Sequence, residues 1–300
     1  MKLAITAIES LSPGLKRFTF AGPALPWAGP GSHLVLEIPE GERPRKNAYS
    51  LIAAPDGAYR IVVRRVERSR GGSHWLHDHA RLGDVLEVQA PQNFFNPPRH
   101  AKHHLLLSAG IGITPFLTYL QIPGLAYELH HCCKPEEANS FRALLPQNAN
   151  AVLHTSRDAL NLQGLLARQR LDTHLSICGP EGFMDDALAA AKSLGWPQAK
   201  IHLESFGSAN WSNSFSVRLQ RSGITVNIRP GESVLEALEA AGLNPSCLCR
   251  GGACGECRME VLEGTPEHHD HYLSDAEKAA GKSMMICVSR AATPELVLDF

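Results

Sequence analysis

Four of the chain's eight cysteines fall within residues 247–257, CLCRGGACGEC. Such a dense group of thiols is compatible with a disulfide knot, a zinc site or an iron–sulfur cluster. The N-terminus, MKLAITAIES, lacks the long apolar core that a signal peptide requires. We therefore expect a cytoplasmic, reducing environment in which disulfides are disfavoured, and thiols that hold metal.

The spacing of these cysteines distinguishes between the two kinds of metal site. Cys249, Cys254 and Cys257 follow the pattern C-x4-C-x2-C, and Cys287 comes after 29 further residues. Plant-type [2Fe–2S] domains have this spacing, whereas zinc sites favour C-x2-C pairs or histidines. Glycines in the loop permit positive φ, so that the backbone can wrap a cluster. We predict Cys249, Cys254, Cys257 and Cys287 as cluster ligands, with Cys247 as an additional thiol that is not a ligand.

The elements around these thiols predict a small α+β domain. Apolar and polar residues alternate over 214–230, which predicts two strands joined by a turn at 221–223. Residues 231–243 have the periodicity of an amphipathic helix that ends at a glycine. Two strands, a helix and then a cluster loop is the order of a β-grasp ferredoxin.

Two glycine-bearing turns follow apolar segments in the middle of the chain. Residues 103–120 predict a strand, a turn and a helix, and residues 174–195 repeat this order around Cys178-Gly179-Pro180. Such a turn brings a diphosphate close to the backbone and to a helix N-terminus, although a plain strand–turn–helix without a ligand also fits. Strands that alternate with helices predict a parallel sheet, in which both turns face one cleft.

The first hundred residues have a different pattern. Short alternating segments separated by glycine and proline predict an antiparallel β-barrel over 1–100. At 47–51, NAYSL sets an aromatic residue beside a hydroxyl, and at 70–79, RGGSHWLHDH is a glycine turn that opens a short helix. The turn suits a phosphate, and an ordinary surface turn is equally compatible with it.

Composition argues against two classes of function. The formal net charge is −1, and no basic stripe or helix-turn-helix is apparent, so we expect no nucleic-acid partner and disfavour a redox-sensing regulator. Residues 105–127 carry no charge and are long enough to span a membrane. Their prolines and glycines favour a buried strand–turn–helix instead, and we expect no membrane association.

Nearly the whole chain resembles the phthalate dioxygenase reductase family. The motifs that carry the resemblance, in order, are AYSL, RGGS, AGIGITPFL, CGPEGFMD, HLESFG, C-x4-C-x2-C and MMICVSRAATPELVLDF. The resemblance implies a multidomain fold: an antiparallel β-barrel FMN domain at 1–100, an α/β parallel-sheet NAD domain at 101–207, a linker at 208–214, and an α+β β-grasp [2Fe–2S] ferredoxin domain at 215–300.

The resemblance also implies a function. Members pass electrons from NADH through FMN and a [2Fe–2S] cluster to a separate Rieske-type oxygenase, and we expect a monomeric reductase. NAYSL and CLCRGGACGEC are most similar to reductase components of carnitine and related quaternary-amine monooxygenases. Alternatives are a reductase for an aromatic-substrate oxygenase of the phthalate or vanillate type, and a stand-alone NADH reductase of small acceptors. NADH is favoured over NADPH, although Ser156 and Arg157 follow a strand where a 2′-phosphate would be recognised.

For the flavin, the resemblance implies binding by a set of barrel residues: Asn47, Ala48, Tyr49, Ser50, Leu51, Val63, Arg64, Gly71, Gly72 and Ser73. Ser50 would lie near the reactive N5 atom. Asn47 departs from the family, which usually has arginine at this position to hold the flavin phosphate. Arg64 and the 71–73 turn are the natural substitutes, with Arg45 a weaker candidate.

For NADH, the resemblance implies binding by residues of the two glycine-bearing turns: Gly110, Gly112, Thr114, Cys178, Gly179 and Pro180. Thr114 and Cys178 would act with Ser50, Glu204 and Phe206 at the site of hydride transfer. The alternative for Cys178 is a buried residue at a strand end. Phe206 would cover the flavin ring until nicotinamide displaces it.

Two histidine-rich stretches raise the question of a further metal site. We expect residues 268–271, HHDH, to form a solvent-exposed loop between the third and fourth cluster ligands. His74, His77 and His79 are expected on the surface of the helix that follows the glycine turn.

Overall fold

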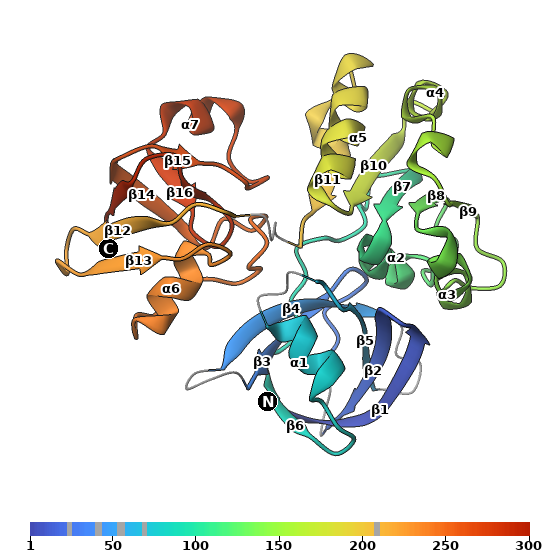
Figure 1. Ribbon diagram of the computed structural model, residues 1–300. Helices are drawn as coiled ribbons and strands as arrows, with labels where there is room; N and C mark the ends of the chain where they lie inside the picture. The colour runs from blue at the N-terminus through green and yellow to red at the C-terminus, as the bar shows by residue number, and fades with distance from the viewer. Residues whose placement is uncertain (23–25, 40–43, 53–57, 68–70, 207–210) are drawn as a thin grey trace. The chain divides into compact units, whose positions relative to one another are not determined.

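The computed structural model describes residues 1–22, 26–39, 44–52, 58–67, 71–206 and 211–300, apart from the side chain of Arg157. These residues form two compact units, Met1–Glu204 and Ser205–Phe300 (Figure 1). The predicted linker at 208–214 lies partly outside the described residues.

The first unit begins with a closed antiparallel barrel, as predicted. Its strands are arranged in the order β1-β2-β5-β4-β3-β6. In β6, Leu86 and Val88 are buried whereas Val85 and Glu87 are exposed, because successive side chains of a strand point to opposite faces. Figure 1 shows the short helix α1 beside the barrel. The elements are β1 (Lys2–Ser12), β2 (Leu15–Ala21), β3 (His33–Ile38), β4 (Arg45–Ile52), β5 (Tyr59–Arg64), α1 (Gly72–Asp78) and β6 (Val85–Val88).

The same unit continues into a parallel sheet of five strands in the order β11-β10-β7-β8-β9. The predicted strand–turn–helix units connect these strands, so the uncharged stretch folds largely as a buried strand and helix. No helix among the described residues is long and apolar enough to cross a membrane. The elements are β7 (His103–Ala109), η1 (Gly110–Ile113), α2 (Thr114–Tyr119), β8 (Tyr127–Cys132), η2 (Pro135–Glu137), α3 (Ala138–Leu144), β9 (Ala151–His154), η3 (Arg157–Ala159), α4 (Leu162–Ala167), β10 (Thr173–Cys178), α5 (Glu181–Ser193), η4 (Gln198–Lys200) and β11 (Ile201–Glu204).

The barrel and the parallel sheet share a hydrophobic core. The rings of Phe95, Phe116 and Tyr119 pack against one another with centroids 5.5 to 5.9 Å apart. The Tyr119 hydroxyl donates a hydrogen bond of 2.6 Å to the main-chain oxygen of Phe95. Aromatic packing of this kind, with its polar end satisfied, fixes the barrel against the first helix of the sheet.

The second unit is a mixed sheet with the strand order β13-β12-β18-β14-β16. The helix predicted at 231–243 is shorter, because α6 begins after Ser233, whose hydroxyl caps it in a reciprocal pair with Glu236. The elements are β12 (Phe215–Leu219), β13 (Thr225–Ile228), α6 (Val234–Ala240), β14 (Arg258–Glu263), β15 (Pro266–Glu267), α7 (Asp275–Ala280), β16 (Ser283–Met285), β17 (Arg290–Ala291) and β18 (Glu295–Leu298).

Arg290 is fully buried inside this unit. Its guanidinium donates hydrogen bonds to the main-chain oxygens of Asn213 and Glu232 and lies over the rings of Trp211 and Phe215. A buried cation is tolerated only where its donors are satisfied. The arginine therefore joins the segment before β12 to the turn before α6.

Candidate functional site

Asn47 and Gly72 touch across the barrel, from strand β4 to the start of α1. A methyl group on Gly72 would lie 2.6 Å from the Asn47 Oδ1 atom, so only glycine allows this approach. The Oδ1 atom is buried and accepts no hydrogen bond from the described residues. A buried amide oxygen without a donor is costly, and this one is therefore free to bind a ligand.

Ser50 offers a second buried polar atom on the same strand. Its hydroxyl oxygen, like the Asn47 oxygen, has no hydrogen-bond partner in the part of the chain that the structure describes. Asn47, Tyr49 and Ser50 pair with Leu36, Leu34 and His33 of β3. The predicted flavin residues of β4 thus lie on one strand, with unsatisfied polar atoms that fit a polar cofactor edge.

The glycine turn before α1 has the predicted backbone freedom. Gly71 has a φ of 116°, and no side chain caps the helix that follows. Ser73 is buried, and its hydroxyl accepts a hydrogen bond of 3.3 Å from the Val66 N–H. The prediction for His77 was wrong: its ring is buried and bonds to the main-chain oxygen of Val63 at 2.9 Å. Because α1 packs on β5, one of its faces points into the barrel.

Arg64 lies at the end of β5 and makes an ion pair with Glu137, whose carboxylate is 2.8 Å from the guanidinium. Glu137 belongs to the turn after β8, so the pair joins the barrel to the parallel sheet. A methyl group on Gly110 would come within 3.6 Å of the same guanidinium. Arg64 is therefore beside the first glycine turn of the sheet. Sequence reasoning missed Glu137, because no local pattern marks an ion pair between residues 73 positions apart.

The two glycine-bearing turns of the sheet are in direct contact. Strands β7 and β10 are parallel neighbours, with Ser108 opposite Cys178, so both strands end at the same edge of the sheet. A methyl group on Gly112 would overlap the main-chain oxygen of Cys178 and lie 2.8 Å from the Gly179 Cα atom. The glycine is needed for this close approach. The two turns that we expected to face one cleft are thus adjacent at the carboxyl edge, where parallel sheets bind ligands.

Cys178, Thr114 and Glu204 lie at this edge with little exposure. Burial and the nearby Glu204 carboxylate raise the pKa of the Cys178 thiol well above its usual value. Thr114 is buried, and its hydroxyl donates a hydrogen bond of 2.9 Å to the Ile111 main-chain oxygen. Cys178 is therefore a neutral thiol at physiological pH, which suits a packing contact and not acid–base chemistry.

Phe206 follows β11 and is 40% exposed. It belongs to the second unit, whereas Glu204 ends the first. Its predicted role over the flavin stays a prediction.

The predicted cluster thiols come together in the second unit. The Cys257 thiol lies 3.1 Å from that of Cys287, and the Cys249 thiol contacts those of both Cys254 and Cys287. The four predicted ligands therefore gather in one place, and a [2Fe–2S] cluster takes four thiolates, two on each iron. Cys247, predicted not to be a ligand, also lies beside Cys257 and Cys287.

The thiols must move apart to admit metal. Two thiolates at 2.3 Å from one tetrahedral ion would be about 3.8 Å apart, which exceeds the Cys257–Cys287 distance. Among the described residues, no group of three or more His, Cys, Asp or Glu side chains has the geometry of a metal site. The donor set itself, three thiols on a glycine-rich loop and a fourth at Cys287, fits a [2Fe–2S] cluster.

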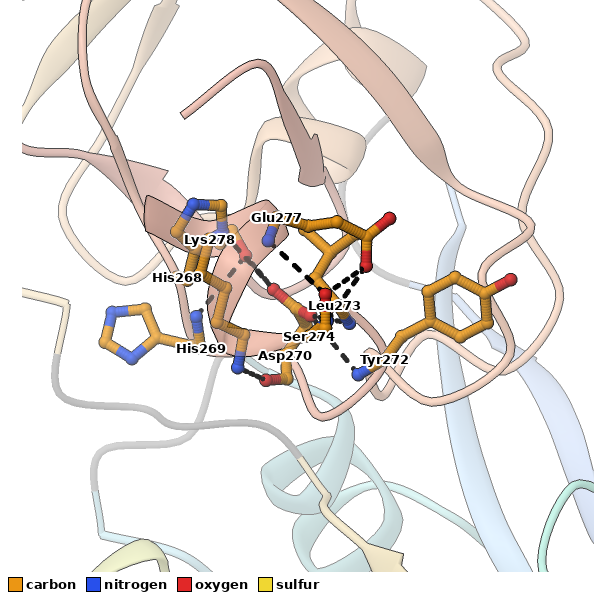
Figure 2. A network of polar contacts seen from close by, with 9 residues as sticks. His268, His269, Asp270, Tyr272, Leu273, Ser274, Glu277 and Lys278 are labelled. Carbon is orange, nitrogen blue, oxygen red and sulfur yellow. Dashed lines mark hydrogen bonds and ion pairs between the residues drawn. The ribbon is translucent and has the colours of Figure 1, made fainter. Parts of the chain in front are cut away.

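The histidine-rich segment is not the solvent-exposed loop that we expected. Asp270 is 1% exposed, and the N–H of His271 donates a hydrogen bond of 3.1 Å to the Gly252 oxygen in the cluster loop. The Tyr272 ring lies against Gly255 so closely that a methyl group there would overlap it. Figure 2 shows the polar contacts that hold this segment. The prediction failed because histidines and acidic residues in sequence do not reveal that their backbone packs on a distant loop.

Comparison with known proteins identifies the family. Residues 217–292 match the 2Fe-2S iron-sulfur cluster binding domain. The heme-dependent oxidative N-demethylase beta subunit of Ectopseudomonas mendocina is 39% identical, over 100% of this chain and 98% of that protein. The carnitine monooxygenase reductase subunit of Acinetobacter baumannii is 37% identical, over 98% and 96%. The structure of phthalate dioxygenase reductase, which transfers electrons from pyridine nucleotides to [2Fe-2S], superimposes with a TM-score of 0.81 at 31% identity and covers 100% and 98%.

The chain belongs to the phthalate dioxygenase reductase family. Membership confirms the predicted multidomain fold and the predicted kind of enzyme, an electron-transfer oxidoreductase with a flavin, NAD(H) and a [2Fe–2S] domain. Within the first unit, the structure places Asn47 against Gly72 and Gly112 against Cys178. Within the second unit, it gathers the predicted cluster thiols.

Proposed function

We propose that this chain is the NADH-dependent reductase component of a Rieske-type oxygenase, with FMN as its flavin. The observation that carries the proposal is the gathering of the Cys249, Cys254, Cys257 and Cys287 thiols in one place. They belong to a separate unit at the end of a chain that begins with a barrel and a nucleotide-type sheet. An iron–sulfur centre after a flavin is useful only where electrons leave singly, for a protein acceptor.

The cofactors supply the chemistry: a hydride from nicotinamide becomes two single electrons at the flavin, and the cluster carries them onward. The residues of this chain hold and orient these groups. Asn47 offers an acceptor and Ser50 a hydroxyl, both buried and without a partner among the described residues. The Gly71–Ser73 turn opens α1 without a side-chain cap, and its glycine backbone suits a phosphate. This arrangement supports FMN, which ends in its phosphate.

On the nucleotide side, we propose that NADH is bound at the edge formed by the Gly110–Thr114 and Cys178–Pro180 turns. Their direct contact makes a single backbone surface that a diphosphate can approach. Arg64 lies beside Gly110 but is already paired with Glu137. The Arg64–Glu137 pair is together close to neutral, which supports a positioning role for Arg64 between barrel and sheet. We expect the residues of this chain to accelerate hydride transfer by positioning the two cofactors, with no residue acting as a general acid or base.

The partner is proposed to be an oxygenase that acts on a quaternary amine such as carnitine. Support comes from the carnitine monooxygenase reductase subunit at 37% identity over almost the full length of both chains. The reductase itself is proposed to be monomeric, because its two units already contain all the residues that this route uses.

A second candidate is a reductase for a heme-containing N-demethylase. The specific observation is the 39% identity to the beta subunit of a heme-dependent oxidative N-demethylase, over the whole chain. In both cases the partner enzyme acts on a carbon attached to nitrogen. The two partners differ in the metal centre that accepts the electrons.

Reconstitution separates the two candidates. Purified holoprotein and NADH are combined with a Rieske-type carnitine monooxygenase in one arm and with a heme-dependent N-demethylase in the other. Product formation in the first arm only is expected. Product in the second arm only would replace the Rieske partner with a heme partner. Fast reduction of dyes and quinones with product in neither arm would instead indicate a stand-alone reductase.

A further inference from the structure

We propose that Asp270 is a positioning residue for the iron–sulfur cluster. From the segment between the third and fourth ligands, it holds both the glycine loop and the chain beyond Cys287. The inference concerns the cluster in this chain and does not depend on the identity of the oxygenase.

The Asp270 carboxylate is almost completely buried and accepts hydrogen bonds from three donors. One oxygen, Oδ2, accepts hydrogen bonds from the N–H groups of Leu273 and Tyr272 at 2.8 and 3.2 Å. The other, Oδ1, accepts one from the Ser289 hydroxyl at 3.2 Å. Figure 2 shows the carboxylate at the centre of this network. Turn formation alone would need only the two backbone donors, so the bond to Ser289 and the burial require another explanation.

Ser289 connects Asp270 to the fourth ligand. It is two residues after Cys287, and its own N–H donates a hydrogen bond of 2.9 Å to the Met285 oxygen. Its hydroxyl also accepts a hydrogen bond of 3.3 Å from the His269 N–H. The turn that carries Cys287 is therefore hydrogen-bonded, through Ser289, to Asp270 and to His269.

Gly252 connects Asp270 to the loop that carries the other ligands. Gly252 has a φ of 71°, and a methyl group on it would lie 3.1 Å from the Asp270 Cα atom and 2.6 Å from Val288. The adjacent His271 N–H bonds to the Gly252 oxygen. The backbone around Asp270 thus packs on the loop between Cys249 and Cys254, where Gly252 leaves no room for a side chain.

The charge of Asp270 acts in the same place. The groups that face the carboxylate are neutral N–H and hydroxyl donors, together with His268, whose Nδ1 atom is 3.5 Å away and outside hydrogen-bonding geometry. Lys278 donates to the Asp270 main-chain oxygen and not to the carboxylate. A buried negative charge on a residue whose Cα and Cβ atoms pack on the loop disfavours addition of an electron to the cluster, because the interior screens it weakly.

The test compares Asp270→Asn and Asp270→Ala with Glu277→Gln in full-length holoprotein. Glu277 belongs to the same segment and caps α7 through Ser274, and the bonds found for it do not include Ser289 or Gly252. The measurements are the rate of iron release to a chelator, the electron paramagnetic resonance spectrum of the reduced cluster, and its reduction potential.

Asp270→Ala is expected to release iron about tenfold faster, as for other residues that orient metal ligands. Asp270→Asn keeps the shape and loses the charge, so it should retain the cluster with a less negative potential. Glu277→Gln should keep the normal potential and iron release, with only a lower melting temperature. If Asp270→Ala does not fold, Asp270→Asn alone decides. An unchanged potential in Asp270→Asn, or an equal shift in Glu277→Gln, would overturn the proposal.

Discussion

The contact between Asn47 and Gly72 gives a physical account of the departure from the family pattern. Where the family usually has arginine, this chain has a short amide whose oxygen is already buried against the glycine turn. An arginine guanidinium would reach a phosphate by itself, whereas the shorter Asn47 amide can only lie beside the glycine turn that starts α1. The glycine at 72 therefore becomes as important as the residue at 47.

Gly72→Ala is expected to weaken flavin binding about tenfold, a cost of roughly 1.4 kcal/mol. The new methyl group would displace the Asn47 side chain from the position in which its oxygen can accept a hydrogen bond. Flavin fluorescence on release measures the dissociation constant. Gly14→Ala is the matched control, since nothing lies within 4 Å of a methyl group at that barrel position. Equal dissociation constants for the two variants would contradict the argument.

At the scale of elements, the parallel sheet buries histidines on neighbouring strands. Burial, reinforced by His174, His103 and His202, lowers the pKa of His104 on β7 to about 4. Burial also lowers the pKa of His131 on β8 to about 3. Both side chains are neutral in the folded sheet at pH 7 and take up protons more readily when the chain unfolds.

Stability of the first unit should therefore decline as the pH falls from about 6.5 toward 4. The unfolded chain binds a proton at His104 near pH 6.5, and the folded chain only near pH 4. This one group should cost on the order of 2 kcal/mol between pH 7 and pH 5. Urea unfolding followed by circular dichroism measures the loss, and His104→Gln should reduce it. An identical pH dependence in that variant would refute the assignment.

In the second unit, Arg290 joins two segments that no strand pairing among the described residues connects: the residues before β12 and the turn before α6. Arg290→Met should lose about 3 kcal/mol of stability, because two buried carbonyls lose their donor. Thermal and urea unfolding of the full chain measure this loss. Arg221→Met removes an exposed ion pair with Asp299 and should change little. A similar loss in both variants would mean that burial of Arg290 adds nothing.

At the scale of the whole molecule, the chain divides its tasks between two units. The proposed flavin residues and glycine turns belong to Met1–Glu204, in which barrel and sheet share a core, and the thiols belong to Ser205–Phe300. We propose that the predicted domains at 1–100, 101–207 and 215–300 are the functional subdivisions of these units. Loss of the cluster should therefore leave the first step of the route unaffected.

Cys287→Ser is expected to leave flavin reduction by NADH at its normal rate and to abolish electron delivery to an oxygenase. Stopped-flow absorbance of the flavin follows the first step, and product formation follows the second. Cys133→Ser, a thiol of the first unit, is the control and should retain both. Normal oxygenase turnover by Cys287→Ser would show that electrons bypass the cluster.

What could be determined from the sequence alone depended on short-range spacing. The C-x4-C-x2-C pattern, the alternation in the barrel strands and the glycine-bearing turns involve residues a few positions apart, whose geometry follows from the local backbone. The family, the fold and the cluster domain could therefore be predicted. The predicted roles of Ser50, Thr114 and Phe206 stay predictions.

Only the tertiary structure decided which distant residues meet. Asn47 contacts Gly72, Gly112 contacts Cys178, Arg64 pairs with Glu137, and Asp270 bonds to Ser289. It also buried His77 and Asp270, which we had expected at the surface. No periodicity marks such pairs, because their separation in sequence is set by the topology of the connections. Which polar side chain is enclosed depends on what packs over it, and that is a property of the folded chain.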